Sequence, residues 1–171
     1  MLRKLSVKTL SDLDKIKEHL RVEHDLENDL INRYIETAHN FVEDYTSLAI
    51  GPQDFEEFLT PDIAEKHVFL SMNPVNSITE VVEINESTGE QTAMTDYVSI
   101  TNGLGVRIKA GHNRSYKVTY NAGQSLADMP YQINQAILLS VGDMYENREE
   151  RIKQKRTSVE YLLNQISIKR I

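Results

Sequence analysis

The chain has 171 residues and contains no cysteine. This absence excludes disulfide bonds, thiolate metal ligands and cysteine nucleophiles, and it is compatible with a reducing compartment. The sequence also lacks an apolar run close to the roughly 20 residues that cross a bilayer, so we expect a soluble protein without membrane contact. The N-terminal residues reach Asp12 and Asp14 before an apolar core can form, and no secretory signal peptide is expected.

Sequence motifs of catalysis are also missing. No G-x-S-x-G elbow is present, and the glycines Gly103 and Gly105 precede the strand-like Val106, which favours a hairpin turn over a phosphate-binding loop. The acidic pairs 56–57 and 149–150 lie in strongly charged stretches. We expect them to be exposed, without the burial that raises the pKa of a catalytic carboxyl. The sequence therefore predicts no enzyme, no catalytic residues and no cofactor.

The five histidines raise the question of a metal site. His39 and Glu43 have the i, i+4 spacing that places two ligands on one face of a helix. Two ligands are too few, and the other histidines are scattered over a helix end, a strand and a turn. We therefore interpret His39 as a surface or half-buried side chain and predict no metal.

Charge is unevenly distributed along the chain, which carries −7 in total. Residues 1–60 hold 7 basic and 13 acidic residues, residues 61–130 hold 5 and 8, and residues 131–171 hold 7 and 5. The acidic first third opposes binding to nucleic acid, whereas the mildly basic end can meet an acidic partner. The two N-terminal helices also do not resemble a DNA-binding helix-turn-helix, because the second presents mainly acidic residues to the backbone phosphates.

Helical periodicity dominates the N-terminal part. Ser11 can cap a first helix, with Asp12 and Asp14 at the positive end of its dipole. A second helix over about five turns has apolar residues spaced by three and four: Leu26, Leu30, Ile31, Tyr34, Ile35, Ala38, Phe41, Val42 and Tyr45. A break follows at Gly51 and Pro52. We assign the N-terminal helices to residues 1–60.

Between residues 66 and 120 the periodicity shifts toward two. Segments rich in Val, Ile, Thr and Tyr predict strands at 67–71, 77–84, 97–100, 106–109 and 116–120. Turn-forming residues separate them, and Asn102 with Gly103 gives a hairpin signal. These features predict a small antiparallel sheet inserted between helices.

A long third helix is predicted to start at Pro130, whose missing N–H and fixed φ suit a helix start. Its apolar face includes Ile133, Ile137 and Val141, and it continues into alternating charges from Glu146 onward. Ser158 can cap a short last helix. The fold class is therefore α+β, a small helical bundle with an inserted antiparallel sheet. We predict one domain over residues 1–171, with the C-terminal helices in residues 130–171.

The charged end of the third helix has two interpretations that the residues leave open. It is either a solvated helix with i, i+4 ion pairs, such as Glu149 with Lys153, or a surface for a partner. The candidate contact residues share a place in this basic segment or in the last helix, and they are Arg148, Arg151, Ile152, Lys153, Lys155, Arg156, Leu162, Leu163 and Ile166.

Several motifs, taken in order, resemble the phage head-tail connector (head-completion adaptor) family. The resemblance begins with a helix, an "hLRV" turn at residues 19–22 and acidic residues before a long helix. It continues with a "PV.SI..V" strand entry at residues 74–81, as in members with a β insertion, and ends with residues 118–123, 129–139 and 145–149. One departure is the last helix, because residues 157–163 lack the Pro and Gly of a "VP.GV..LL" ending.

The resemblance implies a structural role in virion assembly. Such adaptors form rings, typically dodecamers, below the portal protein, extend the DNA channel and provide the platform for the tail or its stopper protein. It implies that DNA passes through without sequence-specific binding, and that the protein resides in the host cytoplasm during assembly and in the neck of the virion thereafter. The alternatives are a tail-completion or neck protein of the same particle, or a small nucleic-acid-binding regulatory domain.

Overall fold

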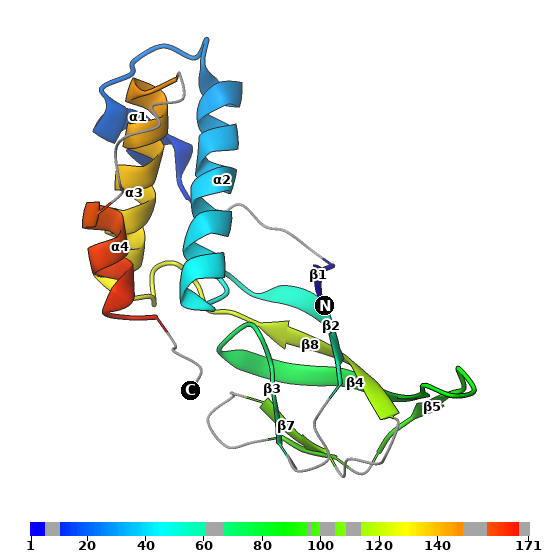
Figure 1. Ribbon diagram of the computed structural model, residues 1–171. Coiled ribbons are helices and arrows are strands. Elements are labelled where there is room, and N and C mark those ends of the chain that lie inside the picture. The colour runs from blue at the N-terminus through cyan, green and yellow to red at the C-terminus, as the bar shows by residue number, and fades with distance from the viewer. Residues whose placement is uncertain are drawn as a thin grey trace. The chain divides into compact units, whose positions relative to one another are not determined.

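The computed structural model describes residues 1–5, 11–60, 67–95, 97–99, 105–108, 114–148 and 157–167. The chain forms two compact units. We call Met1–Lys8 with Gly51–Gln124 the sheet unit, and Thr9–Ile50 with Ser125–Ile171 the helical unit. Figure 1 shows the strands of the first and the helices of the second. The expected α+β class, with an antiparallel sheet inserted between helices, is confirmed.

The helical unit consists of α1 (Leu13–Leu20), α2 (Asn28–Thr46), α3 (Tyr131–Glu146) and α4 (Thr157–Asn164). The α3 helix contacts the other three. The apolar stripes that the sequence predicted meet in one core, because each helix buries its apolar face against its neighbours. The buried members of this core are Ile16, Ile31, Ile35, Ala38, Val42, Ile50, Met129, Ile133, Ala136, Ile137, Val141, Val159 and Leu163.

The ends of α1 and α2 have specific caps. Asp12, rather than Ser11, caps α1, since its carboxylate accepts the N–H of Asp14 at 3.0 Å. The expectation for Ser11 was one residue off. Both helices end in a left-handed residue other than glycine, with φ of 57° at Arg21 and 60° at Ser47. This conformation lets the N–H of Ser47 reach the carbonyl of Glu43 at 2.8 Å and closes the last turn.

The α3 helix is shorter at both ends than the sequence predicted. Pro130 has an extended ψ of 141° and stands before the first helical residue, Tyr131. At the other end Asn147 leaves the helix with φ −111° and ψ 66°, although its N–H still bonds the carbonyl of Asp143. The expected continuation of the helix through Arg148 is therefore wrong. Residues 149–156, over which the helix was also expected to continue, lie outside the described residues.

The main sheet of the sheet unit has five antiparallel strands in the order β1-β2-β8-β4-β5. Their bounds are Leu2–Lys4, Gln53–Leu59, Arg114–Ala122, Val75–Asn85 and Gln91–Ala93, in that order. A second sheet has the order β3-β7-β6, formed by His67–Phe69, Gly105–Ile108 and Tyr97–Ser99. The sheet therefore starts earlier than residue 66, and its edge strand β1 comes from the start of the chain.

On the central strands β2 and β8, buried side chains alternate with more exposed ones. On β8, Tyr116, Val118 and Tyr120 are buried, and the residues between them are half-buried. Phe55 of β2 lies opposite Tyr120 in register, and their rings stack with centroids 5.6 Å apart. Cross-strand aromatic pairs of this kind fix register, because a slip of one residue would turn both rings to the other face.

Glu57 is buried on β2, contrary to the expectation that the pair at 56–57 is exposed. Its carboxylate accepts the N–H of Ser71 at 2.8 Å, the hydroxyl of Ser71 and the hydroxyl of Tyr120 at 3.1 Å. The Tyr120 hydroxyl in turn accepts the N–H of Met72 at 3.2 Å. A buried carboxylate needs such donors, and these bonds tie the connection before β4 to the sheet.

Most expected strands are confirmed, with shifted ends. The strand expected at 77–84 extends to Val75–Asn85, and the one at 116–120 extends to Arg114–Ala122. The expected ends at Ile100 and Lys109 lie outside the described residues, as does the turn at 102–103. Among the strands in the described residues, β1, β2 and β5 were not predicted.

Candidate functional site

The end of α3 is joined to the start of α2 by a cluster of three side chains. The Tyr145 hydroxyl donates to Oε2 of Glu27 at 2.5 Å, and an Nη of Arg148 donates to Oε1 of the same carboxylate at 2.6 Å. The Arg148 guanidinium also lies 4.8 Å from the centre of the Tyr145 ring, a cation–π distance. Because Glu27 directly precedes α2, the cluster fixes where the chain leaves α3.

The cluster is coupled electrostatically. The hydrogen bond from Tyr145, followed by the bond from Arg148, lowers the pKa of the Glu27 carboxyl below its ordinary value. The bond to the carboxylate raises the pKa of the Tyr145 hydroxyl and of the Arg148 guanidinium. Each shift favours the ionic state in which the cluster is fully hydrogen-bonded, since hydrogen bonds to a charged group stabilise that charge.

An ion pair between α1 and the loop before α2 lies close in sequence to this cluster. Nζ of Lys17, a nearly buried side chain on α1, donates to Oδ1 of Asp25 at 2.6 Å. This bond, with a further one from Asn28, lowers the pKa of the Asp25 carboxyl. The loop between α1 and α2 is thus held at Asp25 and again at Glu27.

The predicted contact residues fall into three groups. Arg148 is described and already pairs with Glu27. Arg151, Ile152, Lys153, Lys155 and Arg156 lie outside the described residues. Leu162, Leu163 and Ile166 lie on or just after α4, and Leu163 has no exposed surface because it belongs to the helical core.

The α4 helix is docked on the end of α2. The Tyr45 hydroxyl donates to Oδ1 of Asn164 at 2.9 Å, and the Ser167 hydroxyl donates to the carbonyl of Tyr45 at 3.3 Å. Val159 and Leu163 point into the core, Ile166 packs on its edge, and Tyr161 stays 68% exposed. The exposed surface of α4 therefore includes Tyr161 and does not include Leu163.

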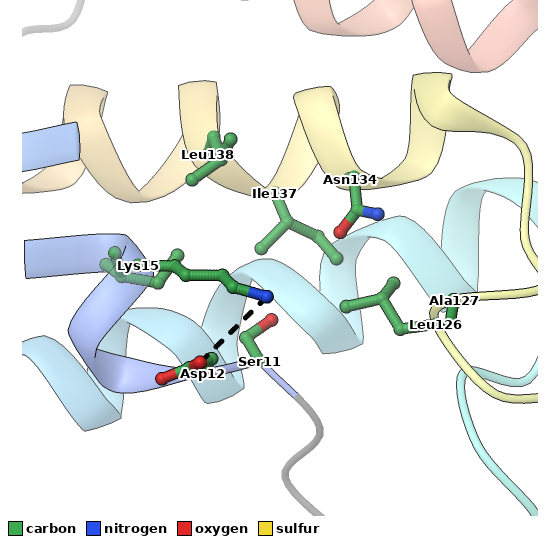
Figure 2. A pocket seen from close by; sticks show the side chains of 9 residues that line it. Ser11, Asp12, Lys15, Leu126, Ala127, Asn134, Ile137 and Leu138 are labelled. Atoms are coloured by element: carbon green, nitrogen blue, oxygen red, sulfur yellow. Dashed lines mark ion pairs between the residues drawn. The ribbon is translucent and has the colours of Figure 1, made fainter. Parts of the chain in front are cut away.

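A groove of about 370 Å³ lies between the start of α1, the first half of α3 and the loop before it. Figure 2 shows Leu126, Ile137 and Leu138 around its apolar part, with the ion pair between Lys15 and Asp12 at the edge. The full lining is Ser11, Asp12, Lys15, Ile16, Leu126, Ala127, Asn134, Ile137 and Leu138. Sequence reasoning missed this groove. Leu126 and Ala127 lie in a loop without periodicity, and only tertiary structure brings them to α1.

The spacing of His39 and Glu43 has a structural explanation. His39 is buried, not at the surface, and its Nε2 lies 2.5 Å from the Ser11 hydroxyl. Oε1 of the buried Glu43 accepts the N–H of Ile50 at 2.7 Å. These bonds hold the segment before α1 and the segment after α2. In the described ranges, no group of three or more His, Asp or Glu side chains is arranged to bind a metal ion.

None of the helices in the described part of the chain combines the length and the apolar character that a membrane span requires.

Comparison with solved structures shows the same fold in neck proteins of a gene transfer agent (GTA) particle. A chain in the "Virion of native gene transfer agent (GTA) particle" matches with a TM-score of 0.78 and 20% identity, covering 100% of this chain and 97% of that chain. Chains in the "Neck of empty GTA particle computed with C6 symmetry" and the "Neck of native GTA particle computed with C12 symmetry" match with TM-scores of 0.78 and 0.75, at 19% and 18% identity and the same coverage. No curated protein matches the sequence.

A family model provides the assignment. The model of the phage gp6-like head-tail connector protein matches residues 10–110, which is more than half of the chain. The match includes α1, α2 and most of the inserted strands. It confirms the family that the sequence motifs resembled, which is a structural family and not a family of enzymes. The chain belongs to the phage gp6-like head-tail connector family.

Proposed function

We propose that the protein assembles as a ring in the neck of a phage-like particle, where it joins the portal to the tail. The observation that carries the proposal is the family match over residues 10–110. The whole-chain likeness to proteins of symmetric GTA necks supports it. A ring of identical copies needs a heterologous interface, in which one patch of each copy meets a different patch of the next.

The ring contains twelve copies in the particle. Support comes from one of the similar necks, which was computed with C12 symmetry. The portal protein lies on one side of the ring, and the tail or a stopper protein lies on the other. The protein is made and assembles in the host cytoplasm and remains in the neck of the finished particle.

The basic segment after α3 contacts the portal. Arg148 is held by Glu27 where the chain leaves α3. The other basic residues of the segment follow it within eight positions, and they are Arg151, Lys153, Lys155 and Arg156. The apolar residues of the proposed contact are Ile152 from the same segment of the sequence and the half-buried Leu162 and Ile166. Leu163 supports the contact only indirectly, by anchoring α4 in the core.

Charge neutralisation tests this contact without removing α4. The variant Lys153→Gln, Lys155→Gln and Arg156→Gln should bind portal more weakly, with a reduced salt dependence, because its charges are lost but the core residues remain. A control with the same charge change replaces the exposed Arg3, Arg21 and Arg33 by Gln. Equal portal binding by both variants and the wild type would argue against this segment.

The acidic character of the protein suits a channel for DNA. The net charge of −7 repels the phosphate backbone, so that a genome can slide past the ring without adhering. A mobility-shift titration at low salt should show no retention of duplex DNA. Tight binding there would instead favour a nucleic-acid-binding domain.

A further inference from the structure

Leu26 is the most exposed large apolar side chain of the described part of the helical unit, at 91%. It was expected in the stripe of the second helix, but α2 begins only at Asn28, and Leu26 projects from the preceding loop. A singly exposed leucine is normal on a protein surface and needs no explanation by itself. The loop that presents Leu26, however, is hydrogen-bonded to helices through the residue before Leu26 and the residue after it.

Both neighbours of Leu26 are anchored to helices. Asp25 accepts from Lys17 of α1 at 2.6 Å and from Asn28 at 3.2 Å. Glu27 accepts from Tyr145 of α3 at 2.5 Å and from Arg148 at 2.6 Å. An apolar side chain presented by a braced loop loses little conformational entropy on binding, which is the property of an interface anchor.

The same unit contains a groove that suits such an anchor. Its volume of about 370 Å³ accommodates a leucine side chain, and Ile16, Leu126, Ile137 and Leu138 supply apolar walls. Lys15, with a side chain 79% exposed, stands at the rim (Figure 2). Exposed acids flank Leu26, at Glu23 and at Asp25, whose side chain is 84% exposed. Asp25 is already bound to Lys17 at 2.6 Å, and Lys15 also lies 4.0 Å from Asp12 at the same rim. Glu23 and Lys15 thus provide one pair of complementary charges, and the apolar walls of the groove provide the rest of the match to the leucine.

We propose that Leu26 of one copy inserts into this groove on a second copy. The anchor follows the C-terminal end of α1, whereas residues at and before its N-terminal end line the groove. The two patches are therefore different surfaces of one chain, as a heterologous interface requires. The inference rests on the proposed ring and adds which surfaces join neighbouring copies.

Cysteine cross-linking tests the contact, because the chain has no cysteine of its own. Leu26→Cys and Ala127→Cys are made as two separate variants. Each variant and their mixture are oxidised, both without portal and with portal. Ala127 lines the groove and is exposed, so the change is mild. We expect a covalent dimer that forms only in the mixture. In the control, Tyr161→Cys, which is exposed on α4 outside the groove, replaces Ala127→Cys and should give little product.

A second variant tests the energy of the contact. Leu26→Asp should weaken self-association roughly 10- to 100-fold or more, measured by sedimentation up to about 1 mM protein, because a buried leucine contact is replaced by a charge. Its thermal unfolding should be unchanged, since Leu26 is exposed in the single copy. Tyr131→Asp, at a residue 89% exposed, is the matched control and should associate as the wild type does.

The outcomes separate this inference from the proposed ring. Rings on portal that form equally well with Leu26→Asp, or cross-linking equal to that of the control pair, would overturn the contact and leave the ring intact. A wild-type chain that ignores portal, together with Leu26→Cys and Ala127→Cys copies that cross-link in the mixture, would support the contact and count against the neck. A wild type that stays monomeric under all these conditions would overturn both.

Discussion

Arg148 donates a hydrogen bond to Glu27 at 2.6 Å and so joins the residue that follows α3 to the residue that precedes α2. The two residues are 121 positions apart in the sequence. This ion pair fixes the point at which the chain leaves α3, where the basic segment of the sequence begins. It also braces the loop that carries Leu26.

The ion pair should show coupling in a double-mutant cycle. Glu27→Gln and Arg148→Met should each lower the melting temperature, and the double variant should lower it by less than the sum, because each single change already breaks the pair. Thermal unfolding followed by circular dichroism measures all four proteins. Additive effects would mean that the two side chains do not interact in solution. Arg33→Met, at an exposed residue of α2, serves as the control.

The Tyr145 hydrogen bond should make stability depend on pH in two directions. The pKa of Glu27 is lowered from its ordinary 4.5, so the stabilisation is present above pH 4.5 and is lost as pH falls through the lowered value. The pKa of Tyr145 is raised from its ordinary 10.0, so the stabilisation is present below pH 10.0 and is lost as pH rises through the raised value.

The difference in melting temperature between the wild type and Tyr145→Phe isolates this effect. It should be largest between these limits and shrink in acid and in alkali. Tyr131→Phe, at a residue that is 89% exposed and lies outside the cluster, should show no such profile. A difference that stays constant from pH 3 to pH 11, about the range over which both groups titrate, would contradict the account.

Leu163 should be far more important for stability than Leu162. Leu163 is fully buried between α4 and the other helices, whereas Leu162 is only half-buried. Leu163→Ala should lower the free energy of unfolding by about 2–5 kcal/mol, and Leu162→Ala by about 1 kcal/mol or less. Chemical denaturation measures both. Equal losses would mean that α4 is not docked as described.

Replacing Gly142 should stabilise the protein. Gly142 lies inside α3, and a Cβ atom there would meet only Nε2 of His19 at 3.7 Å, an ordinary contact with a flexible side chain. Gly142→Ala should therefore raise the free energy of unfolding by about 0.5–1 kcal/mol through helix propensity. A loss of stability would show that α1 packs on α3 more tightly than the structure has it.

The sequence predicted the fold where burial is periodic. The stripes of α2 and α3 identify Ile31, Ile35, Ile133 and Ile137 as core, because a helix repeats its buried face every three to four residues. The strand β2 was missed for the opposite reason. Asp54, Glu56 and Glu57 hide its alternation, and Glu57 can be buried only because Ser71 and Tyr120 supply donors from distant parts of the chain.

The candidate surfaces were harder to predict than the core. Arg148 stands out in the sequence as part of a basic segment, yet its pairing with Glu27 depends on where two helices end. Leu26 fits the apolar spacing of α2, but the helix starts two residues later. The boundaries of elements are set by tertiary contacts and caps, which a single sequence does not specify.

The most direct test of the central claim is electron microscopy of the purified protein mixed with the portal of its own particle. A head-tail connector should appear as a closed ring of twelve copies stacked coaxially on the portal. Free monomers beside unoccupied portals, over a range of protein concentrations, would contradict the claim that this chain builds the neck.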